Sequence, residues 1–161
     1  MNYILDQNGE LYHYGVKGMK WGVRKATKKY EQEMIKYQKD SLRNANRLNL
    51  AAYNQTAREY NNGKIDLFNQ THDSKSETYM DDYAKQFERD YRRNFDKLKL
   101  AEIENNKHYQ KAKKICDEYG LVKVSEVARK NEAFVRDLKR LMAEGKTSWD
   151  MDKSLYVGDK D

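Results

Sequence analysis

The chain contains no proline in 161 residues, so the residue that most strongly interrupts a helix is absent from it. Charged residues make up 36% of the sequence and apolar residues 38%. On a helical wheel drawn at ~100° per residue, one narrow arc collects the apolar residues of a long segment: Met80, Ala84, Phe87, Tyr91, Leu98, Tyr109, Ala112, Cys116 and Tyr119. Such a thin stripe predicts long, largely solvated helices and not a thick globular core.

The first helix is predicted over about residues 26–60. One arc of its wheel holds Tyr30, Met34, Tyr37, Ala45, Leu48 and Ala52. Asn61-Asn62-Gly63 is a strong helix stop, and residues 64–75 are expected to form a connector that places Phe68 in the core.

The second helix is predicted over 76–119, from a Ser76 cap to Gly120. Asn105 falls inside its apolar arc. We favour a solvated or kinked stretch there, although a buried asparagine that fixes the register is the alternative. A third helix over 125–144 begins at Ser125 and ends at Gly145, with a face that we expect to be buried at Val127, Phe134, Leu138, Leu141 and Met142.

Residues 1–24 differ from this helical pattern. The β-prone segments 3–5 and 11–14 flank Asn8-Gly9, which is a hairpin turn signal, and residues 15–24 read as a glycine-punctuated loop. The predicted organisation is therefore a hairpin and loop over 1–24, a helical domain over 25–145 and a polar tail over 146–161. The fold class is mostly α: an elongated hairpin of two long helices, a shorter third helix, and an N-terminal β-hairpin with a Gly-rich loop.

Several classes of function find no support in the sequence. No stretch approaches ~18 apolar residues, so a membrane partner is not expected, and the polar N-terminus is not a signal peptide. The strongest metal ligands are His13, His72, His108 and Cys116, and no two of them have zinc-site spacing. Cys116 is expected to be a small buried side chain. Nucleotide-binding and catalytic motifs are also missing, so we expect no enzyme, no metal and no cofactor.

The positive charge is concentrated near the N-terminus. The net charge is +6, and residues 15–29 hold six bases and no acid. Such a run could meet phosphate or an acidic protein surface. Nucleic acid binding through residues 17–29 is possible but not favoured, because six bases on a nearly balanced chain make a weak footprint.

The segment from Leu11 to Arg24, LYHYGVKGMKWGVR, resembles a short signature of tailed-phage and prophage proteins that runs approximately H-x-G-[IV]-x-G-[MQ]-K-W-G-[VI]-R. The matching residues are His13, Gly15, Gly18, Met19, Lys20, Trp21, Gly22 and Arg24. In those proteins, some of them head-associated, the signature lies near one end and often precedes basic, helical sequence. The resemblance implies a viral or prophage origin and no particular activity.

The same segment has the chemistry of a docking element. Trp21 and Met19 offer apolar anchors, and Lys20 and Arg24 flank the tryptophan with charge. The predicted partner-binding residues are His13, Lys17, Met19, Lys20, Trp21 and Arg24. A purely structural role, in which Trp21 only caps the helix pair, remains equally open.

We therefore expect a non-enzymatic bacteriophage protein that acts by protein–protein interaction and is virion- or head-associated. The alternative is a small phage protein that binds a host defence component or nucleic acid in the bacterial cytoplasm. The partner is a phage or host protein in the first case, and the thin apolar stripe makes homo-oligomerisation possible.

Overall fold

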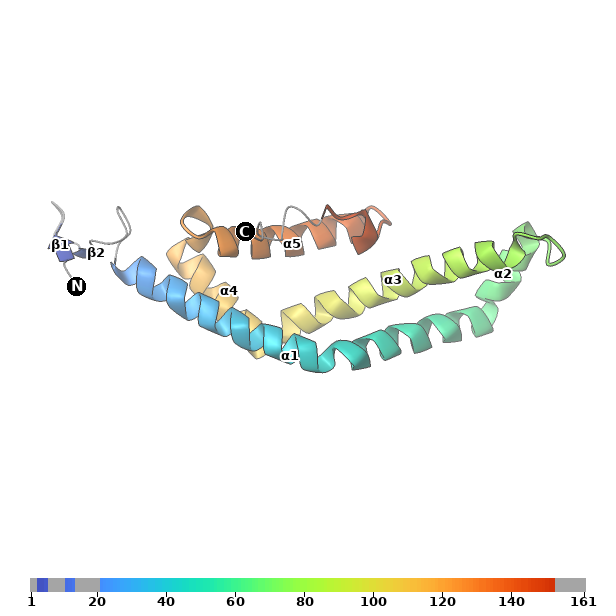
Figure 1. Cartoon of the computed structure of the whole chain (residues 1–161), viewed down its shortest axis with the longest axis horizontal. Coiled ribbons are helices and arrows are strands. Elements are labelled where there is room, and N and C mark those ends of the chain that lie inside the picture. Colours follow the sequence, from blue (N-terminus) through green and yellow to red (C-terminus); the bar gives the residue numbers. More distant parts are fainter. Residues whose placement is uncertain (1–2, 6–10, 14–20, 153–161) are drawn as a thin grey trace.

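The computed structural model describes residues 3–5, 11–13 and 21–152 of the chain. The molecule is an elongated arrangement of helices in which α1 runs along most of its length and the later helices return beside it (Figure 1). Along the part of the chain that the model describes, no helix combines the length and apolarity that crossing a membrane requires.

Helix α1, Trp21–Glu59, is the longest element, at ~58 Å for 39 residues. The predicted arc is confirmed in its main members, since Tyr30, Met34, Tyr37 and Ala52 are buried. The predicted start at residue 26 is corrected: residues 21–24 belong to the helix and not to a loop. The first turns can be helical because Val23 and Ala26 pack against the core.

The predicted stop at Gly63 is a kink and not an end. A π-helical segment η1, Tyr60–Lys64, follows α1, and α2, Ile65–Thr71, continues the chain. Gly63 has φ 132°, which places it outside helical geometry and bends the axis. The region expected to be a connector is therefore mostly helical, while Phe68 is buried as predicted.

The predicted second helix is two helices, α3, Tyr79–Asn105, and α4, Lys107–Tyr119. They meet at Asn106, whose extended backbone (φ −73°, ψ 126°) interrupts the helical path. The Asn106 side chain accepts hydrogen bonds from the backbone N–H groups of His108 and Tyr109 and so caps α4. The kink interpretation is confirmed, and the alternative of a buried Asn105 is wrong, because that residue is exposed.

The chain then turns back over α4. Gly120, in the left-handed conformation with φ 60°, ends α4 and leads into the 3-10 turn η2, Leu121–Lys123. Helix α5, Glu126–Ala143, begins at the predicted Ser125 cap, and the predicted glycine Gly145 (φ 72°) follows it. A second 3-10 turn, η3, Ser148–Asp150, lies against α3 and α5.

Two short strands precede the helices. β1, Tyr3–Leu5, and β2, Leu11–His13, pair antiparallel with Tyr3 opposite His13 and Leu5 opposite Leu11. β2 contacts α1. The expected Asn8-Gly9 turn and residues 14–20 of the expected loop lie outside the described residues, as does the end of the polar tail from residue 153.

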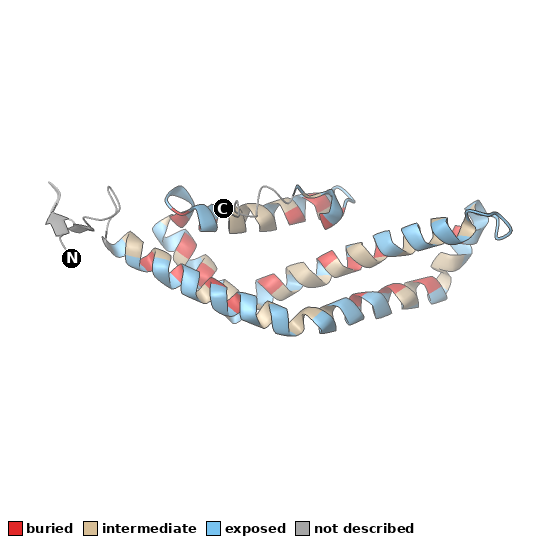
Figure 2. Cartoon of the chain, in the orientation of Figure 1, coloured by how far each residue is buried: buried red, intermediate tan, exposed pale blue. Residues whose placement is uncertain are grey.

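The main core lies where α1, α4, η2 and α5 meet. Its buried members are Ala26, Tyr30, Met34, Tyr37, Ile103, Ala112, Cys116, Leu121 and Ala128. In Figure 2 the buried positions follow the side of α1 that faces α4. The core is thin, because most elements bury one narrow face and leave the rest exposed.

A second, aromatic cluster lies at the far end, where η1 and α2 pack on α3. Tyr60 contacts Tyr83 and Phe87 with ring centroids 5.5 and 5.2 Å apart, and Phe68 lies 5.4 Å from Tyr79. These contacts turn the face that contains Tyr79, Tyr83 and Phe87 inward. The prediction that Met80 and Ala84 are buried is therefore wrong, since the adjacent face to which they belong is exposed. The predicted burial of Tyr119 and Val127 is also wrong, because both side chains are exposed near the ends of their helices.

The interface between α1 and α3 is polar where the stripe predicts apolar contacts. Asp90, Asn94 and Asp96 of α3 are buried. The hydroxyl of Tyr60 donates to Asp90 Oδ2 over 2.8 Å, and Asn94 Nδ2 donates to Thr56 Oγ1 over 3.0 Å. Directional bonds of this kind favour one alignment of the two helices.

Candidate functional site

Three of the six predicted partner-binding residues fall within the described part of the chain, near the start of α1. His13 ends β2, Trp21 opens α1, and Arg24 lies half-buried in its first turn. Lys17, Met19 and Lys20 lie outside the described residues, so the structure does not test whether all six side chains converge. It does connect the signature to the helical body without a break after Trp21.

The first turns of α1 hold the end of the signature in a fixed position. Val23 packs against the core, and its carbonyl accepts a hydrogen bond from Thr27 Oγ1 over 2.8 Å. One turn further, the side-chain amide of Asn131 in α5 donates to the Tyr30 hydroxyl over 2.9 Å. Burial raises the pKa of Tyr30 to about 12, so this side chain stays neutral and packed at ordinary pH.

Basic side chains surround this anchored helix start. Lys25, Lys28 and Lys29 are exposed on α1, whereas Arg24 is partly covered. An anchored backbone with exposed charged side chains can orient an acidic or phosphate-bearing partner without the cost of ordering the helix.

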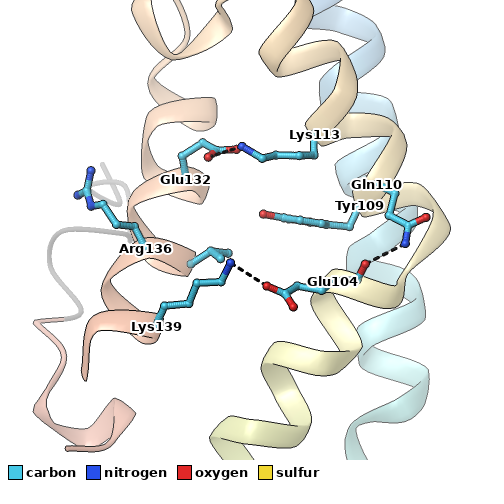
Figure 3. Close-up of a pocket in the computed structure, with 8 residues that line it drawn as sticks. Glu104, Tyr109, Gln110, Lys113, Glu132, Arg136 and Lys139 are labelled. Atoms are coloured by element: carbon cyan, nitrogen blue, oxygen red, sulfur yellow. Dashed lines mark hydrogen bonds and ion pairs between the residues drawn. The ribbon is translucent and has the colours of Figure 1, made fainter. Parts of the chain in front are cut away.

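A separate cleft of about 420 Å³ lies between α5 and the junction of α3 with α4 (Figure 3). Two ion pairs flank it: Lys139 Nζ lies 2.8 Å from Glu104 Oε1, and Lys113 Nζ lies 2.9 Å from Glu132 Oε2. Tyr109 lies between these pairs in Figure 3, and burial raises its pKa to about 12. The four charged side chains of these ion pairs thus hold α5 to α3 and α4. The raised pKa of Tyr109 makes its phenol a poor group for proton transfer at ordinary pH.

One group of potential metal ligands borders this cleft. Single ligand atoms of Cys116, Asp117 and Glu132 lie within 4.8 Å of one another. However, Lys113 Nζ occupies the space beside both carboxylates, 3.1 Å from Asp117 Oδ1 as well as 2.9 Å from Glu132. Burial alone lowers the pKa of Lys113, but hydrogen bonds to Glu132 and Asp117 raise it above its ordinary value. Burial also raises the pKa of Cys116, so a neutral thiol faces a bound ammonium, which is an unsuitable set for a metal.

Two contacts between distant parts of the chain were not predicted from the sequence. Asp96 accepts hydrogen bonds from both the backbone N–H and the hydroxyl of Ser148, at 2.8 and 2.6 Å, and so fastens η3 to α3. His108 Nδ1 lies 2.7 Å from Glu33 Oε2 and joins α4 to α1. Both contacts pair polar residues far apart in sequence, for which helical periodicity carries no signal.

The comparisons with known proteins bear on the N-terminal segment alone. Residues 6–28 match a family of unknown function, DUF7211. No curated protein and no solved structure matches the chain. The matched range contains the whole signature from His13 to Arg24 and ends in the second turn of α1.

Proposed function

We propose that this chain is a non-enzymatic bacteriophage protein that acts by protein–protein interaction and is associated with the virion or its head. In this proposal, residues 13–24 dock onto a phage or host protein and the helical body forms an extended support. The observation that carries the proposal is the position of the signature, which leads directly into the anchored first turn of α1 at one end of an elongated molecule.

The anchored helix start supports docking. Val23 is partly buried and packs against the core, so the backbone on either side of it is held in a defined position relative to α4 and α5. A partner that binds Trp21 and Arg24 therefore does not have to order this part of the chain. Preorganisation of this kind is what a small recognition element needs to bind with useful affinity.

The family match also supports a portable element. A segment of 23 residues that recurs in a family, here ahead of a helical body to which no solved structure is similar, is the expected form of a docking tag. The phage assignment itself rests on the resemblance of residues 13–24 to the signature of tailed-phage and prophage proteins.

The alternative is a small phage protein that remains in the infected cell and binds a host defence component or nucleic acid. In this alternative the same surface binds a different partner. The protein content of purified particles therefore distinguishes the two proposals. A virion-associated chain is recovered with the particles, whereas a host-directed chain stays in the lysate.

The docking itself is tested by capture from phage-infected lysate with the full chain, a Trp21→Ala variant and a Trp149→Ala control. Trp149 is the second tryptophan and is 53% exposed in η3, which makes it a matched aromatic deletion away from the signature. We expect Trp21→Ala to lose the captured protein and Trp149→Ala to retain it. The captured protein should stay bound at about 0.5 M salt, because an apolar anchor is far less salt-sensitive than phosphate contacts.

Equal capture by the two variants, or loss of the captured material on nuclease treatment, would contradict the proposal. Circular dichroism establishes that each variant keeps its helix content. A Lys20→Ala, Arg24→Ala double variant tests the contribution of the flanking charges separately, because it removes them without deleting the tryptophan.

A further inference from the structure

The outward face of α1 carries a row of exposed bases. At ~100° per residue, eight of them fall within an arc of ~120° on the side turned away from α3 and α4: Lys25, Lys28, Lys29, Lys36, Lys39, Arg43, Arg47 and Arg58. We call this row the basic strip. From its first to its last member it extends over ~50 Å of helix at 1.5 Å per residue.

Acidic side chains meet the strip at one edge, where Asp40 has the same angle as Arg58. The two nearest, Glu33 and Asp40, are at one edge and are engaged by α4: Glu33 by His108 and Asp40 by the side-chain amide of Asn106. Among the ion pairs between described residues, Lys36 with Glu33, at 3.4 Å, is the one that involves the strip. With respect to the described residues, the charge of the other seven bases is therefore available to a partner.

The net positive charge is concentrated on α1, the helix that carries the strip. Helix α1 has nine bases against four acids, whereas the whole chain has a net charge of +6. The packing of α3 and α4 on the opposite face leaves this side uncovered by the described residues, as the exposed positions along α1 in Figure 2 indicate. An uncovered row of cations along one helix is complementary to a polyanion.

The residues between the bases indicate which polyanion fits. Single-stranded nucleic acid is bound largely by aromatic stacking, and no aromatic residue lies within the strip. Interfacial helices insert a continuous apolar face into a membrane, whereas Leu50, 60% exposed, is the one large apolar side chain of α1 within the strip, and Gln32, Asn46 and Asn54 also lie among the bases. Lys, Arg, Asn and Gln side chains are typical donors to phosphate oxygens of a duplex.

We infer that the basic strip of α1 binds the phosphate backbone of double-stranded nucleic acid without sequence preference. This surface extends well beyond residues 17–29 and is distinct from the proposed protein-docking signature. Docking and duplex binding are therefore separable, and neither depends on the other.

The test measures binding of the full chain to a labelled duplex of about 30 base pairs between about 50 and 200 mM salt. A strip variant replaces Lys36, Lys39, Arg43 and Arg47 with glutamine. The control makes the same change in net charge at Lys85, Lys97, Lys111 and Lys114, which are exposed on α3 and α4. Lysine, arginine and glutamine have similar helix propensities, so both variants should stay folded.

We expect the affinity of the unchanged chain to fall about a thousandfold over this salt range, as for a protein that makes about six phosphate contacts. The strip variant should bind more weakly at about 50 mM salt and lose only about tenfold, since roughly two contacts remain. The control should keep the salt dependence of the unchanged chain.

Three results would overturn the inference. Equal losses in the strip and control variants would mean that net charge alone drives binding, and an unaffected strip variant would place binding in residues 17–29. Tighter binding to a single strand of the same length, or to vesicles of anionic lipid, would assign the strip to a different partner. Absence of duplex binding at about 50 mM salt would also overturn it.

Discussion

Cys116 occupies the part of the core where α4, η2 and α1 come together. It is 1% exposed, and burial raises the pKa of its thiol. Its buried position follows from the apolar arc of the sequence, and it is confirmed. The neighbours of Cys116 could not be predicted in the same way, because Lys113, Asp117 and Glu132 are brought together by the return of α5 over α4.

The burial of Cys116 leads to a direct test. A thiol reagent should label the native protein slowly, since the thiolate is both inaccessible and disfavoured, and should label the denatured protein rapidly. Mass spectrometry of samples taken over time measures both rates. Rapid labelling of the native chain would mean that α4 does not pack against α1 as described.

The carboxyl of Glu33 makes the stability of the fold depend on pH. The hydrogen bond from His108, reinforced by Lys36, lowers the pKa of the Glu33 carboxyl below its ordinary value of 4.5. A carboxyl with a lowered folded-state pKa stabilises the fold above about pH 4.5, and this stabilisation is lost as the pH falls through the folded-state pKa.

We therefore expect the free energy of unfolding to decrease between about pH 6 and pH 3.5, and to decrease less in Glu33→Gln. Urea denaturation at the two pH values measures the difference. The neighbouring, exposed Glu31 provides the control, and Glu31→Gln should follow the unchanged protein. Identical pH dependence in Glu33→Gln would show that the contact with His108 does not form.

At the level of elements, the helices are largely a consequence of local sequence. The Ser125 cap, the glycines at 120 and 145 and the wide arc of α1 predict the corresponding elements well. The register of α3 against its neighbours is not local, because buried Asp90, Asn94 and Asp96 have their partners on η1, α1 and η3, respectively. An amphipathic pattern treats such residues as solvent-facing, which is why the stripe misplaces Met80 and Ala84.

The signature was visible in sequence as a candidate site, but its geometry was only partly predictable. The extension of α1 back to Trp21 depends on Val23 and Ala26 packing against residues more than ninety positions away, such as Leu121 and Ala128. A glycine-rich local pattern therefore predicted a loop where tertiary contacts extend a helix.

The junction between α3 and α4 offers a matched pair of substitutions. Asn106→Ala removes the cap of α4 and the hydrogen bond to Asp40, and it should lower the free energy of unfolding by about 1–2 kcal/mol. Asn105→Ala, one residue earlier and exposed, should change it by less than about 0.5 kcal/mol. Thermal or urea denaturation measures both. Equal effects would place the helix junction elsewhere.

For the whole molecule, the arrangement of long helices with a thin core makes an extended shape unavoidable. A compact protein of this length has a radius of gyration of ~15 Å, whereas α1 alone is ~58 Å long. Small-angle X-ray scattering of the monomer should give a radius of gyration above about 20 Å with an elongated distance distribution. A value near 15 Å would mean that the helices collapse into a different packing in solution.

The two proposed surfaces follow one another along the chain. Residues 21–24, the described end of the signature, form the start of α1, and the basic strip begins at Lys25 and follows the outer side of the same helix. One chain could thus contact a protein at its end and a duplex along its length.

The central claim is that residues 13–24 bring this chain into the virion, and quantitative mass spectrometry of purified phage particles tests it most directly. Particles are prepared from phage that encode the unchanged chain, Trp21→Ala or Trp149→Ala, and each amount is normalised to that in the infected-cell lysate. We predict that the unchanged chain and Trp149→Ala are recovered with the particles, whereas Trp21→Ala is depleted at least about tenfold, the equivalent of ~1.4 kcal/mol of lost binding. Absence of the unchanged chain from particles despite its abundance in the lysate, or equal recovery of all three chains, would contradict the account.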